Sequence, residues 1–75
     1  MRIVIRKNIS EKAYQDYGFV QSVMTGYYYQ TFNNGNKLMI DRKTKEVILD
    51  FQTSSIDFFI CLLRMYLDRV IEIEV

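Results

Sequence analysis

The sequence predicts an α+β domain with a four-stranded antiparallel meander at about 19–51 and a short strand at each end of the chain. It further predicts a short helix at about 11–17 and a long helix at about 55–69 that packs on one face of the sheet. Turn residues divide the meander region into four apolar runs, and the segment after it has apolar residues at helical spacing. At both ends of the chain, isoleucines alternate with charged residues. With 75 residues, the chain is expected to form one domain spanning 1–75.

The terminal strands have matching patterns. Segment 2–6 places its two isoleucines on one face and its two arginines on the other, and segment 71–75 alternates apolar residues with Glu72 and Glu74. Arginines and glutamates on neighbouring strands attract each other. We therefore expect the two strands to pair, with their isoleucines facing the long helix.

The short helix is predicted from its ends. Ser10 is a favourable N-cap, Ile9 and Tyr14 occupy the positions of a hydrophobic staple, and Gly18 can adopt the left-handed conformation that ends a helix.

Three loops define the meander. Thr25-Gly26 and Asn34-Gly35 predict two-residue turns, because glycine and asparagine tolerate positive φ, and 42–45 predicts a four-residue loop. These lengths place Lys37 opposite Asp50 and fix which side chains share a face. The predicted core face holds Val20, Met24, Tyr27, Tyr29, Leu38, Ile40, Val47, Leu49 and Phe51. The predicted open face holds Phe19, Gln21, Val23, Tyr28, Gln30, Phe32, Lys37, Met39, Asp41, Glu46, Ile48 and Asp50.

The long helix is apolar on more than one side. Ser54 is its expected N-cap, Asp57 lies in its first turn, and Arg69 lies near its C-terminal end, where each charge favours the helix dipole. The stripe expected to cover the sheet is Ile56, Phe59, Ile60, Leu63, Leu67 and Val70. Phe58, Leu62 and Met65 widen the apolar surface beyond what one sheet contact needs, which indicates a second contact.

The composition argues against catalysis. The chain has no histidine, which removes the commonest general base and metal ligand, and we expect no enzyme activity, no cofactor and no catalytic or metal-binding residue. Cys61 fits a small hydrophobic residue in the core. Asp41 and Glu46 flank the basic loop and are interpreted as neutralising its cations.

Targeting and charge patterns predict a cytoplasmic location. One cysteine cannot form an intramolecular disulfide, and the apolar runs are too short for a signal-peptide core or a membrane span. The formal net charge of +1 gives no overall attraction to nucleic acid or to an anionic membrane.

The function predicted first is a non-enzymatic domain that binds another protein, and a homodimer is expected because a small domain without staples often gains stability by association. The residues expected at such interfaces are Tyr28, Phe32, Met39, Ile48, Phe58, Leu62 and Met65. The alternative is single-stranded nucleic-acid binding on the open face, with phosphate contacts from Arg42, Lys43 and Lys45. Carboxylates on that face disfavour the alternative. The high content of Ile, Lys, Tyr, Phe and Asn suggests a phage- or plasmid-type accessory or inhibitor protein.

Overall fold

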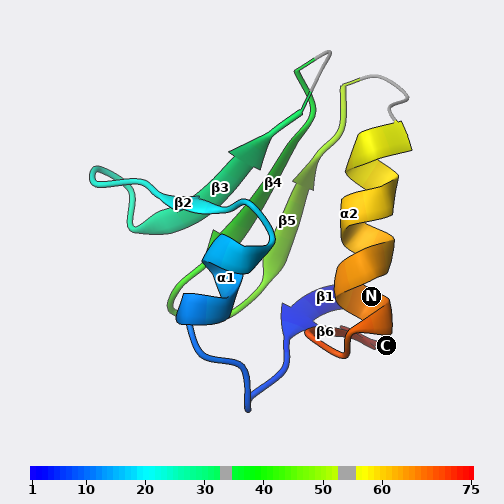
Figure 1. Cartoon of the computed structure of the whole chain (residues 1–75). Coiled ribbons are helices and arrows are strands. Elements are labelled where there is room, and N and C mark those ends of the chain that lie inside the picture. The colour runs from blue at the N-terminus through cyan, green and yellow to red at the C-terminus, as the bar shows by residue number, and fades with distance from the viewer. Residues whose placement is uncertain (33–34, 53–55) are drawn as a thin grey trace.

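The computed structural model describes residues 1–32, 35–52 and 56–75. It confirms the predicted α+β class, with a four-stranded antiparallel sheet in the order β2-β3-β4-β5 and a two-stranded pair β1-β6 (Figure 1). The elements are β1 (Arg2–Ile5), α1 (Lys12–Asp16), β2 (Val20–Gln21), β3 (Tyr27–Thr31), β4 (Lys37–Asp41), β5 (Val47–Asp50), α2 (Ile56–Leu67) and β6 (Ile71–Glu74).

The terminal strands pair as predicted. β1 and β6 run antiparallel with Ile3 opposite Ile73. The predicted charge pairs are present: Arg2 lies 3.7 Å from Glu74, and the guanidinium of Arg6 lies 3.6 Å from the carboxylate of Glu72. Both are exposed pairs and add little to stability.

An isolated β-bridge joins this pair to the meander. Val4 bridges Glu46 in antiparallel fashion, and the backbone N–H of Ile5 donates to the carbonyl of Lys45 at 2.8 Å. Val4 and Ile5 are both buried at this junction. The N-terminal strand is therefore held by β6 on one side and by the start of β5 on the other.

Both helices pack on the same face of the meander and share one core. In α1, the ring of Tyr14 meets the ring of Tyr28 edge-on at 4.9 Å, and in α2 the ring of Phe58 meets Phe32 in the same way at 5.7 Å. α2 lies beside β5, with α1 in front of the lower part of the meander (Figure 1). The buried core is made of Ile5, Tyr14, Phe19, Tyr28, Leu38, Ile40, Val47, Phe58, Met65, Val70 and Ile71.

The predicted faces of β2 and β3 are wrong, while those of β4 and β5 are correct. Tyr28 is only 6 % exposed and lies opposite Ile40, whereas Tyr29 is 36 % exposed. The cause is the length of the β3–β4 loop, because the β2–β3 loop differs from expectation by two residues and so leaves Val20 and Tyr29 on a shared face as predicted. A one-residue slip in register moves every side chain of a strand to the other face.

The β3–β4 connection has three residues where two were expected. The N–H of Phe32 donates to the carbonyl of Asn36 at 2.8 Å, and Gly35 has a φ of +83°. A left-handed glycine at the end of a three-residue loop is a common hairpin solution. Asn34 of the predicted two-residue turn lies outside the described residues.

The β2–β3 connection has four residues where two were expected. The N–H of Ser22 donates to the carbonyl of Tyr27, and the N–H of Gly26 returns to the carbonyl of Ser22. The 42–45 loop was predicted correctly and has the same form, since the N–H of Lys45 donates to the carbonyl of Asp41 at 2.8 Å. Lys45 adopts a left-handed φ of +66°, and Gly26 occupies the same position of the other loop with a φ of +75°. Lys37 pairs with Asp50 as predicted.

The predicted inner stripe of α2 is also wrong, apart from Val70. Phe58 and Met65 are fully buried, and Cys61 and Leu62 are half-buried against the core. The residues expected to cover the sheet face outward instead: Ile56, Phe59, Ile60, Leu63 and Leu67 are all exposed. Both sets have helical spacing, so the choice depends on the tertiary contacts of Phe58 and on the turn into β6.

The helix ends differ from expectation at one cap. α1 begins after Glu11, which makes no side-chain hydrogen bond to the helix, so the predicted N-cap at Ser10 was wrong. The predicted N-cap of α2, Ser54, lies outside the described residues. Gly18 has the predicted left-handed φ of +92°, and the N–H of Phe19 donates to the carbonyl of Tyr14. α2 ends in the same way at Arg69, with a φ of +60°. These are Schellman motifs, which satisfy the last helical carbonyls.

Candidate interaction surfaces

The outward face of α2 is apolar along its whole length. We name Ile56, Phe59, Ile60, Leu63 and Leu67 the outer α2 stripe. Ile56 is 74 % exposed and Phe59 is 49 % exposed, and Tyr66 lies exposed beside them. A monomeric protein seldom exposes a continuous patch of large apolar side chains, which mark interfaces when they occur together.

An apolar groove continues this surface onto the terminal strands. Its volume is about 390 Å³, and it lies where α2 meets β1 and β6. Since every lining side chain is aliphatic or aromatic, the groove offers mainly apolar packing, with the hydroxyl of Tyr66 as the polar group among its lining side chains. We name it the β1–β6 groove; its lining residues are Ile3, Phe59, Leu62, Leu63, Tyr66, Ile71 and Ile73.

Charged side chains occupy the flank of α2 that faces α1. The hydroxyl of Tyr17 donates to Asp68 at 2.7 Å, and the guanidinium of Arg64 lies 5.5 Å from the centre of the Tyr17 ring. The hydrogen bond to Asp68 is the main cause of the raised pKa of the Tyr17 hydroxyl, with burial adding to it. Asp57 lies further along the helix and is exposed.

A second surface is the outer face of the meander. Tyr27, Tyr29, Met39 and Ile48 lie on it, and we name these four the open-face cluster. Tyr29 pairs with Met39, which in turn pairs with Ile48 on β5. A shallow hollow of about 280 Å³ adjoins the two tyrosines; Ser22, Thr25, Tyr27, Tyr29, Lys37 and Met39 line it. The corrected register thus exposes two tyrosines where one was predicted.

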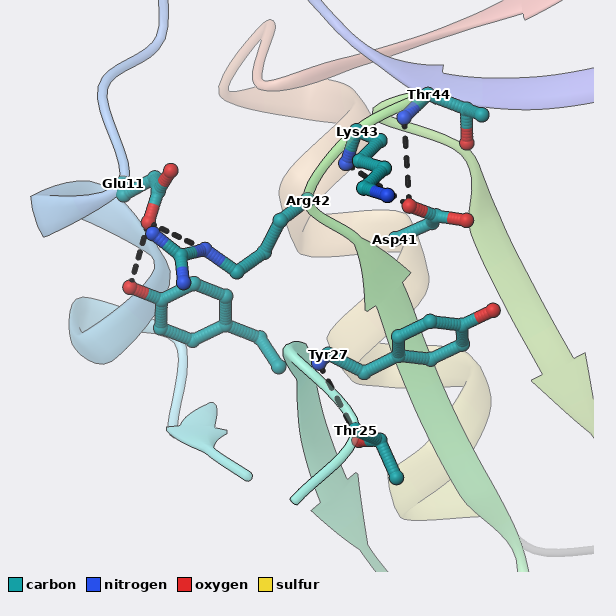
Figure 2. A network of polar contacts seen from close by, with 8 residues as sticks. Glu11, Thr25, Tyr27, Asp41, Arg42, Lys43 and Thr44 are labelled. Carbon is teal, nitrogen blue, oxygen red and sulfur yellow. Dashed lines mark hydrogen bonds and ion pairs between the residues drawn. The ribbon is translucent and has the colours of Figure 1, made fainter. Parts of the chain in front are cut away.

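A polar network closes the loop end of the meander. Glu11 accepts a hydrogen bond from the hydroxyl of Tyr28 at 2.8 Å and another from Nε of Arg42 at 3.1 Å. Figure 2 shows Arg42 reaching across to Glu11, the residue directly before α1. The hydrogen bond from Tyr28 is the largest cause that lowers the pKa of Glu11, and the same bond raises the pKa of Tyr28. This network attaches α1 to the sheet.

Asp41 organises the 42–45 loop. One carboxylate oxygen accepts the backbone N–H of Lys43 at 2.9 Å and that of Thr44 at 3.3 Å (Figure 2). The bond from Lys43 is the largest cause that lowers the pKa of Asp41. A hollow of about 570 Å³ lies between this loop and the β2–β3 turn. Glu11 and Asp41 both line it, so its charge is mixed and does not favour an anion.

The three predicted phosphate contacts have different surroundings. Arg42 is paired with Glu11, and Nζ of Lys45 lies 6.0 Å from the centre of the Tyr14 ring. Lys43 is exposed. The loop therefore presents less free positive charge than its sequence suggested.

The predicted interface residues divide between core and surface. Tyr28, Phe58 and Met65 are buried, Phe32 and Leu62 are half-buried against the core, and Met39 and Ile48 lie half-buried on the open face. The exposed apolar surfaces also contain residues that the sequence did not single out for binding: the outer α2 stripe, Ile3, Tyr66 and Ile73 of the groove, and Tyr27 and Tyr29 of the open face. The helical spacing of the stripe is visible in the sequence, but it predicts a core position for these residues.

Other reactive groups are few. The Cys61 thiol is half-buried, 3.6 Å from Oε1 of Gln30, and burial raises its pKa. Within 1–32, 35–52 and 56–75, no group of three or more acidic or cysteine side chains is placed to hold a metal ion. In these same ranges no helix has the length and apolar character needed to cross a membrane.

Comparison of the chain with protein-family models, with curated proteins and with solved structures finds no match.

Proposed function

We propose that this protein is a non-enzymatic domain that acts by binding another protein through the outer α2 stripe and the adjoining β1–β6 groove. The observation that carries the proposal is the exposure of large apolar side chains along one whole side of a helix whose other side already fills the core. Burial of apolar area is the main favourable term in protein association. Polar residues at the edge of such a patch, as Asp57 and Arg64 are here, are typical of protein interfaces.

The test is affinity capture with matched baits. The wild-type chain, Leu63→Lys and Met24→Lys are immobilised and exposed to a lysate of the source organism and to the chain itself. Leu63 lies at the centre of the stripe, and Met24 is an exposed apolar residue in the β2–β3 loop, distant from it in the fold. We expect Leu63→Lys to lose the partners that wild type and Met24→Lys retain, because a lysine there would be buried unpaired. Equal capture by all three baits would reject the surface.

A second candidate is single-stranded nucleic-acid binding at the open-face cluster. The observation in its favour is that Tyr27 and Tyr29 both lie on that face with Lys37 beside them, since bases stack on aromatic rings near cations. Asp41 and Asp50 border the same face and repel phosphate. Fluorescence anisotropy with a labelled single-stranded oligonucleotide tests it: binding should weaken steeply with salt and be lost in Tyr29→Ala. Absence of binding at low salt would remove this candidate.

The biological setting belongs to the proposal as well. The single cysteine favours a cytoplasmic protein. The composition and the small size suit an accessory or inhibitor protein of phage or plasmid type. An inhibitor of this kind works by occupying a surface of its target, for which a binding face without catalytic groups is sufficient.

A further inference from the structure

We propose that the occupant of the outer α2 stripe is a second copy of this chain, docked with its α2 antiparallel to the first about a twofold axis near Ile60 and Cys61. This inference depends on the proposed function, because it names the partner of the same surface. It specifies a geometry that the general proposal does not. Three independent features of α2 and its surroundings support it.

The first feature is the spacing of the stripe. Positions 56, 59, 60, 63, 66 and 67 repeat at intervals of three and four residues over all of α2. Residues at this spacing form the seam along which two helices pack side by side at a small crossing angle. The seam starts at the first residue of α2 and ends at the last, and an antiparallel copy centred near Ile60 and Cys61 covers most of that length.

The second feature is the charge along one edge of the stripe. Asp57 and Arg64 are seven residues apart, about two helical turns, and therefore lie on the same flank. Within the described residues neither forms an ion pair. A twofold axis lying in the interface brings the same flank of both helices together and reverses their direction. Asp57 of each copy then meets Arg64 of the other, which forms two equivalent ion pairs.

The third feature is the position of the groove. Its helical lining residues Phe59 and Tyr66 lie on the flank opposite to Asp57 and Arg64. The same axis therefore places the grooves of the two copies next to each other, on the side without charges. Apolar area that α2 alone would leave open is covered there by the partner's aromatic side chains. Antiparallel helices also have opposed dipoles, which is favourable.

Analytical ultracentrifugation over a concentration series tests the inference. We expect a monomer–dimer equilibrium that Leu63→Lys shifts to monomer and that Met24→Lys leaves unchanged. Asp57→Arg and Arg64→Asp should each weaken the dimer about tenfold by replacing two attractive pairs with repulsive ones. The double variant, with both charges reversed, should regain wild-type affinity. Circular dichroism establishes that each variant is folded, and the charge variants keep the test valid if Leu63→Lys does not fold.

Three results would overturn the inference. A monomer at every concentration, with stripe-dependent capture of a foreign protein, would reject the second copy and leave the proposed function standing. A dimer that is indifferent to Leu63→Lys but lost in Tyr29→Lys would move the contact to the open-face cluster. A dimer that Leu63→Lys breaks, but that shows no recovery in the double charge variant, would reject the antiparallel arrangement.

Discussion

The hydroxyl of Tyr28, the middle tyrosine of three, donates a hydrogen bond of 2.8 Å to the carboxylate of Glu11. The ring of Tyr28 is buried against Tyr14 and has the guanidinium of Arg42 5.8 Å from its centre, while its hydroxyl reaches Glu11. One side chain thus belongs to the core and to the contact between α1 and the sheet.

We expect Tyr28→Phe to lower the free energy of unfolding by about 1 kcal/mol at neutral pH. This is the contribution of an average protein hydrogen bond, because partial exposure to solvent weakens the attraction to the charged carboxylate. The pKa of Glu11 is lower in the folded chain than its ordinary value of 4.5. The contribution of ionised Glu11 to the free energy of unfolding is therefore complete above pH 4.5, and it is lost as the pH falls through the pKa of Glu11 in the folded chain. Urea denaturation should show the difference between wild type and variant shrinking as the pH is lowered below 4.5.

The control for this experiment is Tyr29→Phe, which removes a hydroxyl from the exposed neighbour. It should match wild type at each pH. A Tyr28→Phe defect that stays constant from neutral to acidic pH would show that ionised Glu11 is not the partner that matters.

Alanine substitutions of neighbouring tyrosines test the register. Tyr28→Ala removes a buried ring and should destabilise the domain by about 3 to 5 kcal/mol, enough to unfold a domain of this size or to lower its melting temperature greatly. Tyr29→Ala should lose less than about 1 kcal/mol, since it is a surface change. Thermal melting followed by circular dichroism measures both. Similar losses in the two variants would contradict the observed pairing of Tyr28 with Ile40.

Adjacent phenylalanines test the orientation of α2. Phe58 is fully buried and Phe59 is half-exposed. We expect Phe58→Ala to reduce stability by about 3 to 5 kcal/mol, and Phe59→Ala to have a clearly smaller effect on the monomer, because a cavity forms only at the buried site. Melting at low protein concentration isolates the monomer. If Phe59→Ala proved the more damaging change, the helix would be rotated relative to this structure.

Replacing Gly18 by alanine is expected to destabilise the domain for two reasons, and a matched variant separates them. Its φ is +92°, and an added Cβ would lie 2.6 Å from Nε2 of Gln30. Gly26 also has positive φ, at +75°, but a Cβ there would have nothing within 4 Å. A left-handed residue other than glycine is disfavoured by about 1 to 2 kcal/mol. Gly26→Ala should therefore show this backbone effect alone, and Gly18→Ala should exceed it.

Adding Gln30→Ala to Gly18→Ala should remove the excess and leave the backbone effect. Chemical denaturation of these three variants, of Gln30→Ala alone and of wild type completes the comparison. Equal effects of Gly18→Ala and Gly26→Ala would mean that the Gln30 side chain moves aside without loss.

Much of the fold could be predicted from local sequence. The Arg2–Glu74 and Arg6–Glu72 pairs followed from charge alternation, and the pairing of Lys37 with Asp50 followed from the length of the 42–45 loop. These strand pairings could be predicted because the alternation of charged and apolar residues in the two strands fits only one register. The faces of β4 and β5 were correct for the same reason.

The tyrosine register could not be predicted from these rules because turn-forming residues permit more than one loop length. Glycine at 26 and at 35 serves a two-residue turn or the left-handed end of a longer loop equally well. In a run of three tyrosines the two faces of the strand carry the same kind of side chain, so the sequence does not indicate which face is buried. The pattern of β3 therefore gave no sign that the predicted loop length was wrong.

The face of α2 was undetermined for a related reason. Phe58, Leu62 and Met65 have helical spacing, and so does the stripe that begins at Ile56. A helix with apolar residues on opposite sides can pack either way until other segments decide. The contacts of Phe58 with Phe32 and Phe51, which no periodicity predicts, make that choice here. The candidate interface was consequently predicted as a second apolar surface, but on the wrong side.

The pairing of β1 with β6 has a consequence for synthesis of the chain. Ile3 has no strand partner on that side until Ile73 has been synthesised. Val4 and Ile5 can first contact Glu46 and Lys45, but the strand pair closes around them only when β6 is present. A nascent chain that stalls before β6 has left the ribosome should therefore keep its β1 segment accessible to chaperones.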